Sequence, residues 1–139
     1  ESIRIDPELS EGYYRRGISQ INLMNPSDAI EDFKLAKQFE VEDQVNAGIP
    51  DGLGQCYHMQ SKYNDALTEY EAAIEIEPEN TDFMMHRAQC YVDMKNFDAS
   101  IRDLNVANKC AETDPQILYK LGLSYYLDEQ FRQCVKTLK

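Results

Sequence analysis

The sequence predicts an all-α protein, a solenoid of paired helices, because one skeleton of residues recurs along the chain. The step is 34 positions, and the residues that keep it are mostly small or aromatic. They are Gly54, Ala88 and Gly122; Tyr57, Tyr91 and Tyr125; Tyr63, Phe97 and Phe131; and Ala66, Ser100 and Cys134. A fixed period of this size is the mark of a repeat protein. Each period reads as two amphipathic helices joined by a short turn, so the units must stack to bury their apolar faces.

The second period shows the skeleton most fully. Counted from Ala47, it resembles the tetratricopeptide repeat (TPR), in which a bulky residue, Leu-Gly, Tyr, Ala, Phe, Ala and Pro follow at fixed steps. The matching residues are Leu53, Gly54, Tyr57, Ala66, Tyr70, Ala73 and Pro78, and Pro50 departs from the pattern at the bulky position. The resemblance implies a right-handed α-α superhelix of helix-turn-helix repeats.

The resemblance covers the whole chain and divides it into six segments. They are residues 1–9, the end of a preceding repeat; 10–43, the first repeat; 44–46, an inserted junction; 47–80, the second repeat; 81–114, the third; and 115–139, a truncated fourth. We expect Lys139 to fall partway through the second helix of the fourth repeat. We also expect the natural protein to continue beyond both ends.

Physical requirements explain the skeleton position by position. Gly54 and Ala66 lie where the two helices of a repeat approach closely, so neither position accepts a large side chain. Pro78 stops a second helix, because proline cannot continue one. Asn25 followed by Pro26 is a good helix start, since Asn is a preferred N-cap and Pro suits the first helical position.

The period breaks once, between the first and second repeats. Gly54 follows Gly17 by 37 positions, so the junction holds three extra residues. We expect the second helix of the first repeat to run long and the next helix to start late, near Pro50. A harmless irregular junction and a hinge that resets the superhelical pitch are both consistent with this excess, because loops tolerate insertions at low cost.

Two repeats carry an arginine inside the first helix and an aspartate sixteen residues later. These residues are Arg16 with Asp32, and Arg87 with Asp103. An arginine half-buried between helices needs a carboxylate partner, so we predict two salt bridges within repeats. The alternative is that each arginine binds a carboxylate of a ligand.

Charge and cysteine usage restrict the class of partner and the compartment. The 139-residue chain has 25 acidic against 14 basic residues, a net charge of −11. This balance argues against nucleic acid and against an anionic membrane surface, which both require clustered Lys and Arg. The alternative is that the acidic charge only keeps the protein soluble. Cys56, Cys90, Cys110 and Cys134 form no CxxC pair, which indicates reduced thiols in an intracellular, cytoplasmic location.

The first helices of successive TPRs line a concave groove that often holds a peptide or a partner helix, and the resemblance implies such a face here. The predicted partner-binding residues are Tyr14, Ile18, Asp51, Gln55, His58, Met85, Gln89, Tyr119, Leu123 and Tyr126. Exposed Tyr and Met side chains are suitable anchors. The alternative is that neighbouring repeats or a missing segment cover this face.

A TPR that grips the carboxylate tail of a chaperone uses Lys, Asn and Arg at defined groove positions. In one register those positions hold Tyr14, Ile18, Gly52, Asp82 and His86, and in the other Asp51, Gln55, His86, Gln116 and Lys120. Only Lys120 is clearly cationic, and a carboxylate needs cationic donors. The sequence therefore argues against a chaperone tail.

No arrangement of residues indicates catalysis, a metal or a cofactor. His58 and His86 fall in different repeats, and no Cys or Asp completes a metal set with them at usable spacing. The favoured function is an adaptor or scaffold segment that binds a basic or apolar segment of another protein. The alternatives are a solenoid spacer or self-assembly element, and the regulatory arm of an enzyme whose catalytic domain lies elsewhere in the chain.

Overall fold

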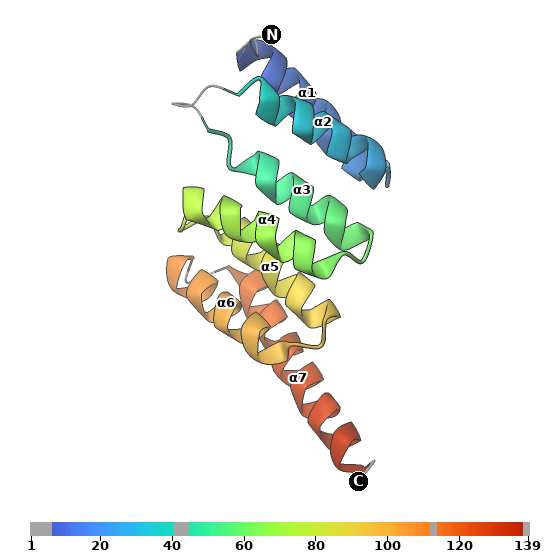
Figure 1. Cartoon of the computed structure of the whole chain (residues 1–139). Helices are drawn as coiled ribbons and strands as arrows, with labels where there is room; N and C mark the ends of the chain where they lie inside the picture. Colours follow the sequence, from blue (N-terminus) through green and yellow to red (C-terminus); the bar gives the residue numbers. More distant parts are fainter. Residues whose placement is uncertain (1–6, 41–44, 112–113, 138–139) are drawn as a thin grey trace. The chain divides into compact units, whose positions relative to one another are not determined.

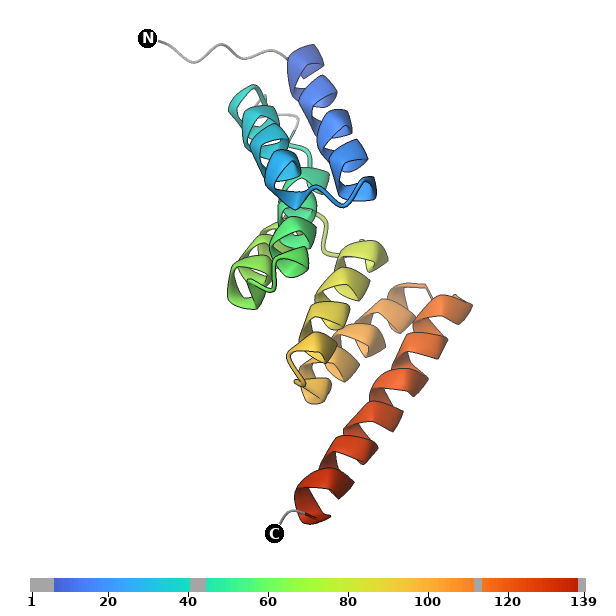
Figure 2. The same ribbon diagram turned by 90° about the vertical axis from the view of Figure 1, so that its right-hand side faces the viewer.

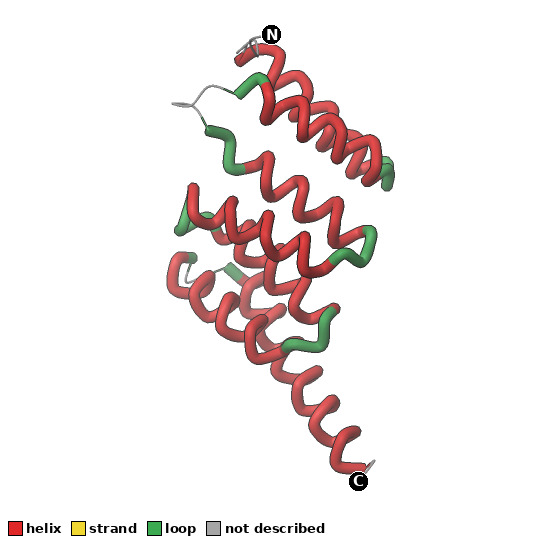
Figure 3. Tube along the Cα trace, in the orientation of Figure 1, coloured by secondary structure: helices red, strands yellow, loops and turns green. Residues whose placement is uncertain are grey.

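A computed structural model describes residues 7–40, 45–111 and 114–137, and every regular element in these residues is an α-helix (Figures 1 and 3). The helices are α1 (Pro7–Asn22), α2 (Pro26–Gln38), α3 (Gly48–Met59), α4 (Tyr63–Ile76), α5 (Thr81–Asp93), α6 (Phe97–Cys110) and α7 (Pro115–Thr137). None of the described helices is long and apolar enough to cross a membrane. The predicted all-α class is confirmed.

The chain forms two compact units, Glu1–Pro78 and Glu79–Lys139. The first unit contains α1 to α4 and the second α5 to α7. In the first unit α1 packs on α2, α3 packs on α4, and α2 and α3 join the two pairs. In the second unit α5 packs on α6, and α6 packs on α7.

One turn geometry closes the three helix pairs. Its central residue has a positive φ of 62° at Met24 and Ser61 and of 64° at Lys95. The next residue donates its backbone N–H to the carbonyl five positions earlier, at 2.8 Å in all three turns. The left-handed residue reverses the chain within one residue, which brings the second helix back onto the first.

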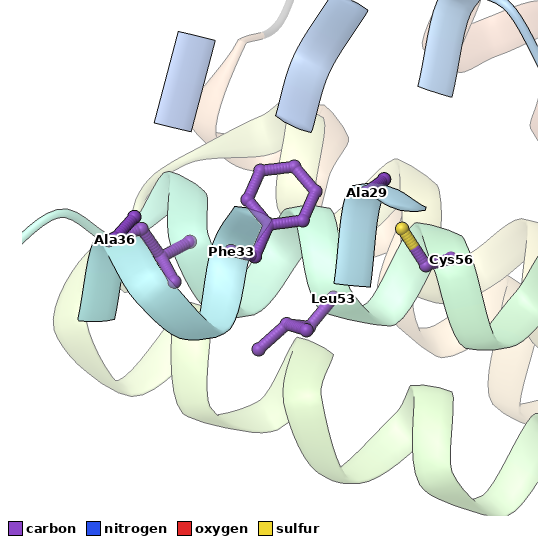
Figure 4. Close-up of a cluster of buried hydrophobic side chains, with 6 residues drawn as sticks. Ala29, Phe33, Ala36, Leu53 and Cys56 are labelled. Atoms are coloured by element: carbon purple, nitrogen blue, oxygen red, sulfur yellow. The ribbon is translucent and has the colours of Figure 1, made fainter. Parts of the chain in front are cut away.

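The core of the first unit is built around Phe33, which has no exposed surface (Figure 4). A Cβ atom at Gly17 of α1 would lie 2.8 Å from the Phe33 ring, and one at Gly52 of α3 would lie 2.5 Å from it. Leu53 and Cys56 of α3 complete the cluster. The predicted close approach at Gly54 and Ala66 is confirmed as well, because a Cβ at Gly54 would lie 2.6 Å from the Tyr70 ring and Ala66 has no exposed surface.

Both predicted salt bridges are present. Arg16 donates from Nε (2.9 Å) and Nη2 (2.6 Å) to the same oxygen, Oδ1 of Asp32. Arg87 donates from Nε to Oδ2 (2.8 Å) and from Nη2 to Oδ1 (2.6 Å) of Asp103. Each pair joins the first helix of a repeat to the second. The arginines are thus engaged within their own repeats.

The junction between α2 and α3 differs from the prediction. Helix α2 ends at Gln38 and is no longer than the other second helices, so the expectation of a long helix is wrong. The extra residues lie in the connection, and α3 begins at Gly48, two residues before Pro50. Proline is tolerated there because the first turn of a helix has no internal partner for its backbone N–H groups. The backbone N–H of Gly48, in this first turn, donates to the side-chain Oδ1 of Asn46 at 2.8 Å.

The fourth repeat differs more strongly, because α7 is one continuous helix through Thr137 (Figure 2). The expected second helix, in which Lys139 was to lie, does not form within the described residues. Glu129 stands where Lys95 turns the third repeat, 34 positions earlier. Side-chain contacts four residues apart span this point, from Arg132 to Asp128 (3.2 Å) and from Gln133 to Glu129 (2.9 Å). Such pairs and the good helix propensity of Glu and Gln favour a straight helix.

Candidate functional site

The predicted partner-binding residues lie on the first helix of each repeat, and the two units are described separately. In the first unit they lie on α1 and α3, and in the second on α5 and α7. The first-unit residues are Tyr14, Ile18, Asp51, Gln55 and His58; the second-unit residues are Met85, Gln89, Tyr119, Leu123 and Tyr126.

In the first unit Tyr14 links α1 to α3. Its ring lies 5.9 Å from that of Phe33, and a Cβ at Gly48 would clash with its hydroxyl. Burial raises the pKa of the Tyr14 hydroxyl, and the carboxylates of Asp51 and Glu77 raise it further. Tyr14 therefore has a packing role that the sequence did not reveal, and removing its ring would disturb the fold.

Asp51 and Gln55 occupy one side of α3 and contact each other. Gln55 donates from Nε2 to Oδ2 of Asp51 at 2.9 Å. Asp51 is 5% exposed, which differs from the expectation of an exposed acid. It lies in the first turn of α3, where a negative charge is stabilised by the helix dipole. Ile18 packs on the hydrophobic core, and the His58 ring lies edge-on to Tyr63 at 5.8 Å.

The second unit has a small cleft between α5 and α7, and α6 lines its base. Gln89 and Val92 of α5 line one side, and Lys120 and Leu123 of α7 line the other. The structure thus brings two predicted residues, Gln89 and Leu123, to one place. Its cavity volume is about 10 Å³, far below the usual range of about 300–1,000 Å³ for small-molecule pockets. The cleft is therefore close to the smallest size that holds one water molecule.

The most exposed predicted residues form a stripe on α7. Tyr119, Leu123 and Tyr126 are 71%, 40% and 60% exposed, and their spacing of four and three places them on one helical face. Met85 differs from the prediction, because it is buried together with its neighbours Phe83 and Met84. Three consecutive apolar residues cannot all share one helical face, so sequence spacing alone could not assign the exposed one.

The sequence reasoning missed two features. Lys120 was noted only as an isolated cation, and its place in the cleft was not foreseen. A second hollow of about 100 Å³, partly open to solvent, lies between α2, α3 and α4 beside the junction. Ile49 and Leu53 belong to its apolar part, and Glu69 to its charged part. Burial raises the pKa of the Glu69 carboxyl. The three-residue excess was the one sequence signal for irregular packing there.

Metal ligands and reactive thiols were the two kinds of chemical group to look for among the described side chains. Among these residues no group of three or more His, Cys, Asp and Glu is arranged to hold a metal ion. Burial raises the pKa of the Cys56 thiol to about 12 and that of the Cys90 thiol to about 11, so both remain protonated near neutral pH. A protonated buried thiol is a poor nucleophile.

Comparison with known sequences identifies repeats in the centre of the chain. A family model described as "Tetratricopeptide repeat" matches residues 57–123. A segment of 67 residues, 48% of this chain, is 30% identical to the Hsp70-Hsp90 organising protein of Plasmodium falciparum (isolate 3D7). That segment spans only 12% of the length of the relative.

Solved structures share the fold at low sequence identity. The TPR domain of Sgt2 from Aspergillus fumigatus has a TM-score of 0.79 at 14% identity, covering 96% of this chain and 87% of that one. The first TPR of Spaghetti (RPAP3), bound to the HSP90 peptide SRMEEVD, has a TM-score of 0.78 at 12% identity, covering 90% and 97%. PcrH in complex with the chaperone binding region of PopB has a TM-score of 0.72 at 20% identity, covering 88% and 97%.

The structural similarity of these proteins establishes the fold. The family model and the residues that recur every 34 positions identify the type of repeat. Residues 57–123 are therefore tetratricopeptide repeat sequence, and the chain shares the fold of TPR domains.

Proposed function

We propose that this chain is a protein-interaction module, an adaptor segment that binds a basic or apolar segment of another protein. Structures with the same fold include TPR domains bound to peptides and PcrH bound to a region of PopB. They support a protein-binding role in general. The residues of this chain suggest the chemistry of its partner.

The observation that carries the proposal is the surface of the second unit. The stripe of Tyr119, Leu123 and Tyr126 on α7 borders the small cleft between α5 and α7, and it offers exposed aromatic and aliphatic anchors. Tyrosine provides a large contact area at low entropic cost, which is why it is frequent among residues that dominate binding energy. An apolar segment flanked by basic residues would match this stripe and a net charge of −11.

A chaperone tail is retained as an outcome of the test. The comparisons do not support the prediction against it, because two neighbours are RPAP3 domains bound to HSP90 and HSP70 peptides. The groove residues of this chain still offer few cations, and Asp51 would repel a carboxylate. We therefore place a basic, apolar segment ahead of an acidic tail.

The test is an affinity capture from lysate with three versions of the chain, followed by identification of the bound proteins. The variant Tyr119→Ala/Leu123→Ala/Tyr126→Ala removes the stripe. The control variant Leu23→Ala/Val106→Ala removes equally exposed apolar side chains elsewhere (68% and 48% exposed). We expect both to fold, because exposed substitutions usually change stability by less than about 0.5 kcal/mol.

A partner retained by the wild type and the control but lost by the stripe variant supports the proposal. The segment that this partner contributes should then bind as a synthetic peptide. Capture of the same proteins by all three versions would contradict it. If the free peptide SRMEEVD binds the chain and Lys120→Ala weakens that binding, the partner is an acidic tail and not a basic segment.

We further propose that the chain acts without catalysis and in a reducing, intracellular setting. Cys56 and Cys90 are free and buried, and Cys110 is free and exposed. An exposed free thiol is more compatible with a reducing compartment than with an oxidising one. Mass spectrometry of the protein from its natural source, with free thiols alkylated before purification, tests this by counting the reduced cysteines.

A further inference from the structure

The hollow of the first unit combines apolar and charged side chains, and none of the ten predicted partner-binding residues lines it. It lies between α2, α3 and α4 and has a volume of about 100 Å³. Among its apolar residues Ile49 and Leu53 are 1% and 4% exposed, whereas Ile76 is 41% exposed. The hollow is therefore a feature of the first unit alone, whereas the stripe on α7 belongs to the second unit.

Three charged side chains line the hollow, and one of them has no partner among the described residues. Glu40 is engaged, because its Oε2 accepts from the backbone N–H of Asn46 at 2.7 Å. Lys37 is exposed on α2. No other described residue forms a hydrogen bond or a salt bridge with the carboxylate of Glu69, which is half-buried. This carboxylate has lost part of its hydration without gaining a compensating contact.

The charges around Glu69 do not compensate for its burial. Burial raises the pKa of the Glu69 carboxyl and Asp65 raises it further, whereas Lys37 and Lys34 lower it. The net direction is upward, so the two lysines of α2 leave the charged form of Glu69 less stable than in water. A further cation close to this carboxylate would stabilise it.

The first unit is strongly acidic, whereas the second unit is nearly neutral. Residues 1–78 include 16 acidic and 6 basic residues, a net charge of −10, and residues 79–139 include 9 and 8, a net charge of −1. Helix α4, which carries Glu69, has four carboxylates and no Lys or Arg between Tyr63 and Ile76. The first unit therefore attracts a basic segment and repels an acidic one.

The size of the hollow and its chemistry together select the occupant. A cavity of about 150 Å³ holds a benzene ring, so a hollow of about 100 Å³ suits a slender alkyl chain and not an aromatic side chain. A purely apolar chain would bury the Glu69 carboxylate further and leave it unpaired. Lysine combines a straight four-carbon stem with a compact ammonium at its end, whereas arginine ends in a wider, planar fork.

We propose that this hollow binds a lysine side chain of a partner protein, whose stem lies on Ile49 and Leu53 and whose ammonium pairs with the carboxylate of Glu69. The lysine belongs to a basic segment, which the charge of the first unit attracts. The inference rests on the proposed function in one respect, because it takes the partner to be a protein. It adds a second contact, in which the stripe on α7 takes no part.

The test uses n-butylammonium, which has the carbon and nitrogen atoms of a lysine side chain, and two probes with the same butyl chain. These are n-butanol, which is uncharged, and pentanoate, which is an anion. Each probe is titrated into the chain, and the methyl signals of Ile49 and Leu53 are followed by NMR. The methyl signals of Leu104, which is 1% exposed in the second unit, are the internal control.

We expect n-butylammonium to shift the signals of Ile49 and Leu53 and to bind about tenfold more tightly than n-butanol, because its contact with Glu69 is charge-assisted. Pentanoate should leave these signals unchanged. Equal binding of n-butylammonium and n-butanol would overturn the proposal, since the hollow would then select only an apolar chain. Tighter binding of pentanoate, or no shift with any probe, would also overturn it.

Four variants assign the preference for the cation to Glu69. Glu69→Gln keeps the shape of the side chain and removes its charge, so n-butylammonium and n-butanol should then bind equally. The matched control Glu71→Gln removes a charge from an exposed position of the same helix and should retain the preference. Lys37→Gln removes a neighbouring positive charge and should strengthen the binding of the cation. Ala72→Met fills the hollow and should abolish the binding of both probes.

A preference for n-butylammonium that survives Glu69→Gln, or that Glu71→Gln removes equally, would contradict the assignment. Far-UV circular dichroism confirms that each variant is folded. The two proposals fail separately, because the titration of the hollow does not involve the stripe. If the stripe variant captures the same partners as the wild type while n-butylammonium binds beside Glu69, only the proposed role of the stripe is overturned. If the stripe variant loses its partner while the hollow shows no preference for the cation, only the lysine site is overturned.

Discussion

The second repeat and α7 carry nearly the same recurring residues, but these residues are buried in the second repeat and exposed in α7. In the second repeat, α4 folds back on α3 and the Tyr70 ring lies against Gly54 with 1% of its surface exposed. In α7, a Cβ at Gly122 would have no atom of the other described residues within 4 Å, and Tyr125 is 54% exposed. The same residue types are therefore core in one region and surface in the other. What differs is the turn, since Ser61 adopts the left-handed conformation and Glu129 is helical.

This difference indicates that a repeat position has no fixed burial of its own. Its burial depends on whether the second helix is present, because half a repeat cannot bury its apolar face. Matched substitutions in the two regions make this dependence measurable.

The largest expected contrast is between Tyr70→Ala and Tyr125→Ala. Removing the buried ring of Tyr70 should lower the free energy of unfolding by about 3–5 kcal/mol, as for other large aromatic truncations. Removing the exposed ring of Tyr125 should change it by less than about 0.5 kcal/mol in the monomer. Chemical denaturation followed by circular dichroism at low protein concentration measures both. Equal losses would contradict the comparison, and a Tyr125→Ala loss that grows with concentration would show that another copy covers this ring.

The next contrast concerns the salt bridges that join the helices of closed repeats. Arg87 and Asp103 form a two-oxygen fork with side chains 21% and 10% exposed, whereas the Arg16 side chain is 59% exposed and contacts one oxygen. Arg87→Ala leaves a buried carboxylate without its partner and should cost about 3–5 kcal/mol. Arg16→Ala should cost less, because its side chain is mostly exposed and water screens the charge at that site.

Double-mutant cycles with Asp103→Ala and Asp32→Ala separate the pair energies from the packing of the arginine stems. The coupling energy should be larger for Arg87 with Asp103. A larger coupling for the exposed pair would show that burial is not what determines the difference between them.

The sequence predicted the features that recur with the period. The helices, the glycine contacts and the two Arg–Asp pairs follow from residues at matching positions, since the same packing problem recurs in each repeat. The junction was not predicted, because Gly48, Pro50 and Gly52 all weaken a helix and sequence does not say which of them the helix accepts. The continuity of α7 was not predicted either, because it depends on a few tenths of a kcal/mol per residue at Glu129 and Gln130.

The site was predicted less completely than the fold. Helical spacing placed the predicted residues on the first helices of the repeats, and Gln89 and Leu123 line one cleft. It failed for the exposure of Asp51 and Met85, both buried, because burial depends on neighbouring side chains that lie far away in the sequence. The role of the ten predicted residues in binding remains a prediction.

Alanine substitutions at Gly54 and Gly122 should change stability less, and in opposite directions. Gly54→Ala adds a Cβ that meets a fully packed ring, and overpacking costs about 1–3 kcal/mol, partly offset by better helix propensity. Gly122→Ala meets no atom, so only the propensity gain remains, about 0.5–1 kcal/mol. The melting temperature should therefore fall for Gly54→Ala and rise for Gly122→Ala. A fall for both would mean that the space beside Gly122 is filled in solution.

The smallest effect concerns the position that forms a turn at Lys95 and continues the helix at Glu129. Lys95 has a φ of 64°, where a side chain is strained by roughly 1–2 kcal/mol, so Lys95→Gly should stabilise the third repeat by about 0.5 kcal/mol after the larger entropy of the unfolded glycine is included. Glu129→Gly should destabilise the straight α7 by about 1 kcal/mol, since glycine is a poor helix former. The two substitutions are chemically similar and differ in the backbone conformation that each meets. Thermal unfolding of both variants, with helicity measured at 222 nm, compares them directly. If Glu129→Gly instead raises the melting temperature, the glycine has let α7 turn and close its own repeat, and the residue at this position decides between the continuous helix and the turn.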